Sequence, residues 1–313
     1  MFGSRYDVNE EEFQRLIQFP SLMTRALNNA GLLSFMPWLR FFPNESVSLG
    51  KRAISLRDPI LRKKVEEHKR TFDPDNTRDL TDALLSEMFK EEKCAGNATT
   101  VLDESRLEMI LSDLVIGGEE TTTTTLLWSF VYLAAWPEVQ KKISEEMKQV
   151  LDGRKPCLND RGTLHFLEAT INEASRLASI VPLGLPHKTT RDTVVGGWSI
   201  PQNTQVLFNH WAFHHDERHW KNPDTFIPER WLDEEGRLIP GAKLSYLPFG
   251  AGRRVCLGES LAKMELFLIL SNILYRYEIQ KAPNCNPADI EGRMNIIHSP
   301  IPFQVVVNKR PLL

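Results

Sequence analysis

A glycine-rich loop that delivers one cysteine to the start of a helix has the clearest chemical signature in this sequence. The loop covers residues 249–258, and apolar residues at helical spacing predict a helix over 259–277. Cys256 would then face unpaired backbone N–H groups and the positive end of a helix dipole. Both features favour the thiolate, which is the form that ligates a metal. The alternative is an inert buried cysteine beside a glycine-rich turn.

The loop matches a known pattern, Phe-x-x-Gly-x-Arg-x-Cys-x-Gly. The matching residues are Phe249, Gly252, Arg254, Cys256 and Gly258. This pattern resembles the haem-thiolate signature of the cytochromes P450. The resemblance implies that Cys256 ligates the iron of haem b and that Arg254 holds a haem propionate. The glycines, Gly250 among them, would let the backbone approach a flat and bulky group.

A run of poor helix formers lies inside a long helix predicted over 103–135. Residues 117–125 read Gly-Gly-Glu-Glu followed by five threonines, and threonine hydroxyls can bend a helix by bonding backward along it. The run could be a tolerated polar patch, but its apolar flanks predict burial, and a buried carboxylate needs a reason. It resembles the P450 oxygen-activation segment, which implies that Glu120 and Thr121 deliver protons during catalysis.

Glu173 and Arg176 lie three residues apart on a helix predicted over 163–178, so their side chains face each other. Taken alone, such a pair is usually a solvated surface ion pair. Arg230 follows about fifty residues later, inside the sequence Pro-Glu-Arg-Trp. The order and spacing resemble the Glu-Arg-Arg triad of the P450 core. The resemblance implies a buried network that fixes the loop behind the haem and takes no part in the chemistry.

The histidines allow two further interpretations. His187 lies in a segment that, by resemblance, runs beside the haem, so it is expected to contact a propionate. His210 and His214, and likewise His215 and His219, have the i,i+4 spacing that can place zinc ligands on one helix face. A similar histidine-rich stretch occurs in P450s without a metal, so zinc is the minor alternative.

Composition excludes several classes of protein. The chain has 313 residues and a formal net charge of -3, which argues against a nucleic-acid partner. Its four cysteines are scattered without a CxxC pair, which argues against a disulfide framework or a zinc ribbon. No apolar run reaches the roughly 18 residues of a membrane span. The sequons at 44–46 and 97–99 are taken as chance matches.

The expected fold class is mainly α with a small β region. Helices are predicted over 8–35 (broken near Pro20), 58–70, 79–93, 103–135, 138–151, 163–178 and 259–277. A polar loop is predicted over 94–102, and short strands and turns over 182–240.

The P450 resemblance extends over essentially the whole chain. It implies a single catalytic domain over 1–313, equivalent to the C-terminal two-thirds of a family member. The membrane anchor, first strands and first helices are expected upstream of Met1. Residues 36–44, 167–171, 245–252 and 256–268 look most like the steroid 17-alpha-hydroxylase/17,20-lyase group. Residues 189–192 look more like the neighbouring xenobiotic-metabolising branch.

The resemblance implies a monooxygenase on the cytoplasmic face of the endoplasmic reticulum membrane. Electrons would come from NADPH through NADPH–cytochrome P450 reductase, with cytochrome b5 as a further partner, and the substrate would be a steroid or another lipophilic molecule. Arg161 and Lys263 match basic positions that support the lyase step, but Asn172 replaces an expected arginine. The alternatives are a xenobiotic-type P450, a P450-fold isomerase or dehydratase, and an inactive truncated P450.

Overall fold

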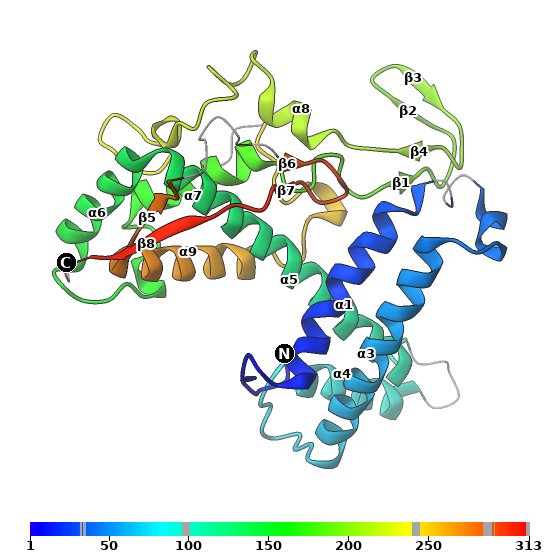
Figure 1. Cartoon of the computed structure of the whole chain (residues 1–313). Coiled ribbons are helices and arrows are strands. Elements are labelled where there is room, and N and C mark those ends of the chain that lie inside the picture. Colours follow the sequence, from blue (N-terminus) through cyan, green and yellow to red (C-terminus); the bar gives the residue numbers. More distant parts are fainter. Residues whose placement is uncertain are drawn as a thin grey trace. The chain divides into compact units, whose positions relative to one another are not determined.

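The computed structural model describes residues 1–31, 33, 36–95, 101–239, 245–283, 290 and 292–310. Over these residues the chain is mainly α-helical with short antiparallel strand pairs, which confirms the expected fold class (Figure 1). It divides into two compact units, Met1–Glu120 and Thr121–Leu313. The boundary falls inside one long helix, α5 (Glu104–Ala135).

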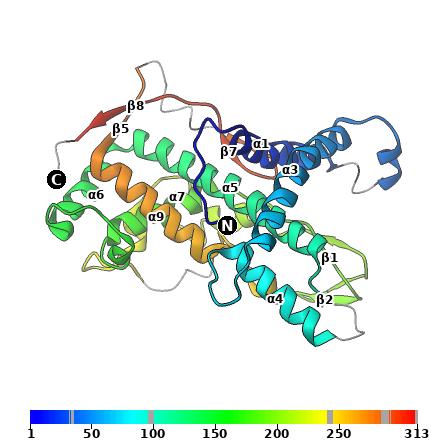
Figure 2. The same cartoon turned by 90° about the horizontal axis from the view of Figure 1, so that it is seen from below.

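The first unit is helical. It contains α1 (Glu11–Asn28), η1 (Pro37–Phe41), α3 (Glu45–Arg70), α4 (Leu80–Ala95) and the first part of α5. Helices α1 and α3 lie along each other, as both views show (Figures 1 and 2). Two apolar clusters form its interior. Their most buried members are Phe19, Ala53, Leu61, Val65, Leu85, Leu107 and Leu111.

Two helix predictions in this unit are wrong. Helix α1 runs unbroken through Pro20, whose ring is buried, because packing against α3 offsets the backbone bond that proline cannot make. Helix α3 begins at Glu45, well before the predicted residue 58. The side chain of Asn44 accepts a hydrogen bond from the Val47 amide at 2.9 Å, so Asn44 is an N-cap. Asparagine followed by an acidic residue was a start signal that the prediction overlooked.

The second unit packs α6 (Pro137–Leu151), α7 (His165–Ala178) and α9 (Glu259–Arg276) with the rest of α5. These helices agree with the predicted ranges. Its interior is apolar and fully buried at Leu133, Ile143, Met147, Leu167, Ala174 and Ala178. Helix α7 lacks a cap of its own at Leu164. Glu146 of α6 supplies one, because its carboxylate accepts from the amides of Phe166 at 2.6 Å and Leu167 at 3.0 Å.

The strands pair antiparallel. The pairs are β1 (His187–Lys188) with β4 (Gln205–Val206), β2 (Thr193–Val195) with β3 (Trp198–Ile200), β5 (Tyr277–Lys281) with β8 (Val305–Lys309), and β6 (Gly292–Arg293) with β7 (Ser299–Pro300). His187 is opposite Val206, and Ile279 is opposite Val307. Short helical segments also occur: η2 (Leu158–Asp160) precedes the first strand, and α8 (His210–His215), η3 (Pro228–Trp231) and η4 (Gly252–Arg254) lie between β4 and β5 in the chain. The prediction of strands and turns over 182–240 missed α8.

Three sequence observations fall outside the described residues. They are most of the predicted polar loop at 94–102, the sequon at 97–99 and Cys285. Within the residues that are described, none of the helices combines the length and the apolar character needed to cross a membrane.

Candidate functional site

Cys256 is an exposed free thiol held by a glycine-turned loop. Gly250 and Gly252 have φ values of 75° and 74°, in the left-handed region that side chains rarely adopt. The Cys256 amide donates to the Phe249 carbonyl at 2.8 Å and closes the loop. The turn therefore depends on glycine at both positions, as the sequence pattern implied.

The loop passes directly into α9, whose N-cap is Gly258. A Cβ added at Gly258 would lie 3.9 Å from the Cys256 sulfur, an ordinary van der Waals contact, so Gly258 lies directly beside the thiol. The Glu259 amide reaches the Cys256 carbonyl at 3.4 Å. Cys256 thus lies just ahead of the N-terminus of a helix of 18 residues.

The surface around this thiol fits a flat ring with an anionic edge. A Cβ built on Gly250 or Gly252 meets nothing within 4 Å, so open space lies in front of the backbone. Val255 is 44% exposed, and Arg254 is an exposed cation. A thiol, apolar surface and a cation are the groups that a haem needs for its iron, its ring and its propionates.

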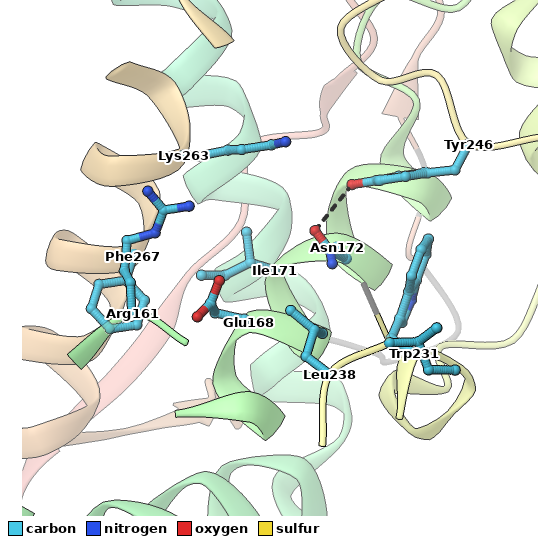
Figure 3. A pocket seen from close by; sticks show the side chains of 10 residues that line it. Arg161, Glu168, Ile171, Asn172, Trp231, Leu238, Tyr246, Lys263 and Phe267 are labelled. Atoms are coloured by element: carbon cyan, nitrogen blue, oxygen red, sulfur yellow. Dashed lines mark hydrogen bonds between the residues drawn. The ribbon is translucent and has the colours of Figure 1, made fainter. Parts of the chain in front are cut away.

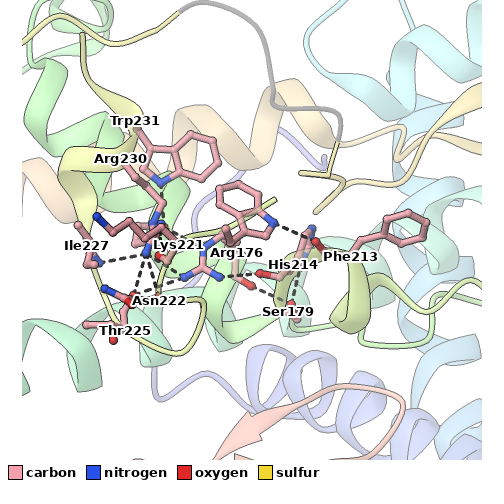
Figure 4. Close-up of polar contacts among 12 residues, drawn as sticks. Arg176, Ser179, Phe213, His214, Lys221, Asn222, Thr225, Ile227, Arg230 and Trp231 are labelled. Atoms are coloured by element: carbon pink, nitrogen blue, oxygen red, sulfur yellow. Dashed lines mark hydrogen bonds and ion pairs between the residues drawn. The ribbon is translucent and has the colours of Figure 1, made fainter. Parts of the chain in front are cut away.

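Glu173 is the centre of a buried polar network that includes both predicted arginines, and Figure 4 labels Arg176 and Arg230. The Glu173 carboxylate accepts hydrogen bonds from two nitrogens of Arg176, at 2.9 Å each, and from Nε of Arg230 at 2.9 Å. The side chains of Glu173 and Arg176 are fully buried, and that of Arg230 is 7% exposed. The structure therefore brings the three predicted residues together, within one unit.

Two further donors complete this network, and sequence reasoning missed them. The Trp231 indole donates to Glu173 at 2.9 Å, and the Ile227 amide donates to the same carboxylate at 3.0 Å. Trp231 follows Arg230 directly in the sequence Pro-Glu-Arg-Trp, so this motif contained the missing signal. With five N–H donors around one carboxylate, the buried charge of Glu173 is balanced and hydrogen-bonded.

The zinc interpretation fails at His214. Its Nδ1 lies 2.7 Å from the Ser179 hydroxyl, and its Nε2 accepts from the Leu247 amide at 3.0 Å. Neither ring nitrogen is left for a metal. The described residues place none of the other three histidines in a group of metal-ligand spacing.

The two residues expected to move protons, Glu120 and Thr121, are consecutive in α5. Glu120 accepts a hydrogen bond from the Thr24 hydroxyl of α1, a partner that the sequence did not indicate. Burial raises the pKa of Glu120, and the Thr24 bond partly opposes that rise. Burial, with the charge of Glu120 as a second cause, also raises the pKa of Glu119.

The threonine run does not interrupt α5. The hydroxyl of Thr125 donates to the Thr121 carbonyl at 2.9 Å, and Ser129 donates to the Thr125 carbonyl at 2.8 Å. The flanks are only partly buried, because Leu127 is 38% exposed while Trp128 is 1% exposed. The apolar residues at 114–116, 126 and 130 are half-buried, so the expected burial of the flanks is correct for Trp128 only.

His187 is exposed on β1 and has its ring 5.1 Å from that of Phe208, edge to face. His187 therefore lies in the predicted strand region, as the sequence indicated, and not in the cysteine loop.

Arg161, Asn172 and Lys263, the three positions that the resemblance linked to lyase activity, line one pocket of about 270 Å3 in the second unit (Figure 3). Asn172 accepts from the Tyr246 hydroxyl at 3.4 Å, and Lys263 pairs with Glu259 at 2.6 Å. The Nε of Arg161 is buried, with no hydrogen-bond partner among the residues that the structure describes. Arg161 and Lys263 share this pocket with the carboxylate of Glu168, so its lining carries charges of both signs.

The comparisons with known proteins agree on one family. A sequence model described as Cytochrome P450 matches residues 1–307. Steroid 17-alpha-hydroxylase/17,20 lyase from Squalus acanthias is 41% identical over 311 residues, 99% of this chain and 61% of that protein. The protein of the same name from Ictalurus punctatus is 41% identical over 312 residues, 99% of this chain and 60% of its own. Cytochrome P450 2U1 from Homo sapiens is 36% identical over 312 residues, 99% and 57% respectively. The chain thus spans about 60% of the length of the curated relatives it matches.

Proposed function

We propose that this chain, which belongs to the cytochrome P450 family, forms over residues 1–313 the catalytic domain of a steroid 17-alpha-monooxygenase. The observation that carries the proposal is the exposed Cys256 thiol ahead of α9, in a loop whose two turns require glycine. The greater identity to 17-alpha-hydroxylase/17,20 lyases than to Cytochrome P450 2U1 supports a steroid as substrate. One oxygen atom of O2 would enter a C–H bond, and the other would leave as water with two electrons and two protons.

Haem b is the cofactor that these residues would hold. Cys256 would provide the thiolate, Arg254 and His187 would pair with propionates, and Gly250, Gly252 and Gly258 would allow close approach of the ring. When bound, the haem supplies the oxygen activation and the oxidation, and its thiolate ligand favours O–O cleavage.

Glu120 and Thr121 would deliver the protons. A carboxyl group whose pKa is raised by burial exchanges protons closer to neutral pH than an ordinary glutamate, which suits an acid–base role. The Thr24 hydroxyl would keep this carboxylate in one orientation. Thr121 follows Glu120 directly and would position the proton at the reacting end.

The electron donor would be NADPH through NADPH–cytochrome P450 reductase on the cytoplasmic face of the endoplasmic reticulum. Cytochrome b5 would be a second partner, recognised by Arg161 and Lys263 beside the pocket of Figure 3. Asn172 adds an amide where the resemblance implies a third cation. We therefore expect 17,20-lyase activity to be weaker than hydroxylation, because each basic residue lost from such a surface weakens attraction to an acidic partner.

The test is Cys256→Ala, with Cys157→Ala as the matched control because Cys157 is also an exposed free cysteine. Cys256→Ala is expected to lose the thiolate-type reduced-CO difference spectrum, and Cys157→Ala to keep it. A thiolate spectrum that survives in Cys256→Ala would exclude this cysteine as the ligand.

Turnover then separates the remaining candidates. Steroid hydroxylation that requires NADPH, O2 and reductase supports the proposal. Product formed without O2 or reductase indicates an isomerase or dehydratase. Oxidation of unrelated lipophilic compounds with no reaction on steroids indicates a xenobiotic-type enzyme, and haem binding without any turnover indicates an inactive P450.

A further inference from the structure

His214 lies between the Glu173 network and the cysteine loop, and the proposed chemistry gives it no role. It is 1% exposed, at the end of the short helix α8. Figure 4 shows it beside Arg176 and Ser179. An imidazole loses its hydrogen bonds to water when it is buried, and an apolar ring of similar size would not carry this cost. A buried histidine with a polar partner on both nitrogens therefore indicates a role beyond packing.

The partners of His214 fix its tautomer. The Leu247 amide can only donate, so Nε2 of His214 is the acceptor in that 3.0 Å bond. Nδ1 therefore carries the proton and donates to the Ser179 hydroxyl at 2.7 Å. Ser179 in turn donates to the Arg176 carbonyl at 2.8 Å. Each of these three hydrogen bonds therefore runs in the same direction, with its donor nearer the loop backbone and its acceptor nearer α7.

A second contact ties His214 to the same helix. The Arg176 guanidinium donates to the His214 carbonyl at 2.6 Å, so both the backbone and the ring of His214 are held from α7. On the other side, Leu247 lies two residues before Phe249, whose carbonyl receives the Cys256 amide at 2.8 Å. Hydrogen bonds therefore run from the Glu173 network through His214 to Leu247, two residues before the carbonyl that closes the cysteine loop.

We propose that His214 is a positioning residue that sets the register of residues 245–256 by accepting the Leu247 amide, so that the Cys256 thiol is presented in one orientation. This inference rests on the proposed function, in which Cys256 is the axial ligand. The glycines that give the loop its turns also make it flexible, so an anchor at its first residues is needed. His214 provides that anchor from the most buried part of the unit.

The anchor works only as a neutral ring. A second proton on His214 would place an N–H against the Leu247 N–H and break the contact. Burial lowers the pKa of His214 to about 3, with smaller contributions from the nearby His210, His215 and Arg176. The acceptor is therefore present throughout the pH range in which enzymes of this kind are assayed.

Two substitutions separate the nitrogens of His214. In His214→Gln the longer side chain can place an amide oxygen near the former Nε2, and so keep the acceptor for Leu247. In His214→Asn the shorter side chain can still donate to Ser179 but leaves Leu247 without an acceptor. His219→Asn makes the same change at an exposed histidine and serves as the control.

Each variant of the full chain is compared by amide hydrogen exchange of peptides covering 245–256, and by the thiolate fraction in the CO difference spectrum. We expect His214→Asn to speed exchange of the loop about tenfold, as for the loss of one hydrogen bond. It should also lower the thiolate fraction, while His214→Gln and His219→Asn stay close to wild type. Unchanged loop exchange in His214→Asn, or equal damage from Asn and Gln, would overturn the proposal.

If His214→Asn fails to fold, nitrogen NMR of labelled histidine in the wild-type chain decides. An unprotonated, hydrogen-bonded Nε2 at neutral pH supports the proposal, and a protonated Nε2 overturns it. Cys256→Ala is run in parallel, since loop exchange reports on His214 whether or not Cys256 is the ligand. Failure of the proposed function would therefore leave the thiolate-type spectrum intact in Cys256→Ala, without changing the loop-exchange result for His214.

Discussion

Replacing Glu173 by glutamine should destabilise the second unit severely, although the two side chains have almost the same shape. The Glu173 carboxylate accepts five N–H groups, two of them from Arg176, and neither side chain has any exposed surface. Glutamine removes the negative charge and places an NH2 group where one of the acceptors was. The Arg176 guanidinium would then remain buried without its counter-ion.

The magnitude follows from the cost of an uncompensated buried charge. Removing one partner of a buried ion pair costs about 3–5 kcal/mol. The whole free energy of unfolding of a domain is about 5–15 kcal/mol. At a urea dependence of about 3 kcal/mol per M, the midpoint of unfolding should fall by about 1–2 M.

The assay is urea unfolding followed by circular dichroism, with Glu145→Gln as the control. Glu145 lies on the surface of α6, 55% exposed, and pairs with Lys141 at 3.9 Å. An exposed pair of this kind contributes about 0–1 kcal/mol, so Glu145→Gln should shift the midpoint by less than about 0.3 M. Equal shifts in the two variants would refute the argument that the Glu173 charge holds the network together.

Two other predictions concern proton delivery and acid stability. Thr121→Ala should lower the product formed per NADPH by about 10²-fold and release hydrogen peroxide instead, whereas Thr123→Ala, at an exposed position of the same run, should stay coupled. Equal coupling in both variants would assign the relay to another group. Hydrogen bonding from Arg154 lowers the pKa of Asp160 to about 2, below its unfolded value of about 3.9. The stabilising effect of ionised Asp160 should therefore be present above about pH 4 and be lost as the pH falls toward 2. Thermal unfolding should then show a steeper fall in melting temperature over this pH range for the wild type than for Asp160→Asn.

The order of the motifs and most of the helices could be predicted from the sequence. Helical spacing identified α4, α5, α6, α7 and α9, because the side chains that decide a helix are close neighbours in the chain. The errors lie where local rules were overridden by packing or misread. Pro20 is tolerated inside α1, where it is buried in a helix that packs along α3, and the capping asparagine at 44 was not recognised as a start.

The candidate site was predictable in its residues but not in its connections. A fixed pattern identified Cys256 and its glycines, since backbone geometry at a tight loop leaves few residue types to choose from. Nothing in the sequence indicated that Thr24 would bond Glu120, 96 residues further along the chain. Nor did it indicate that Asn172, Arg161 and Lys263 would share one pocket.

The sequence by itself determined the cysteine loop, the helix behind it and the pair of glutamate and arginine on α7, because each depends on residues within one or two turns of one another. Only the tertiary structure decided which distant residues form hydrogen bonds with these elements. Trp231 reaches Glu173 across 58 positions, and Leu247 reaches His214 across 33. Such contacts are set by the packing of whole elements, and a buried polar group accepts whatever donor that packing brings within reach.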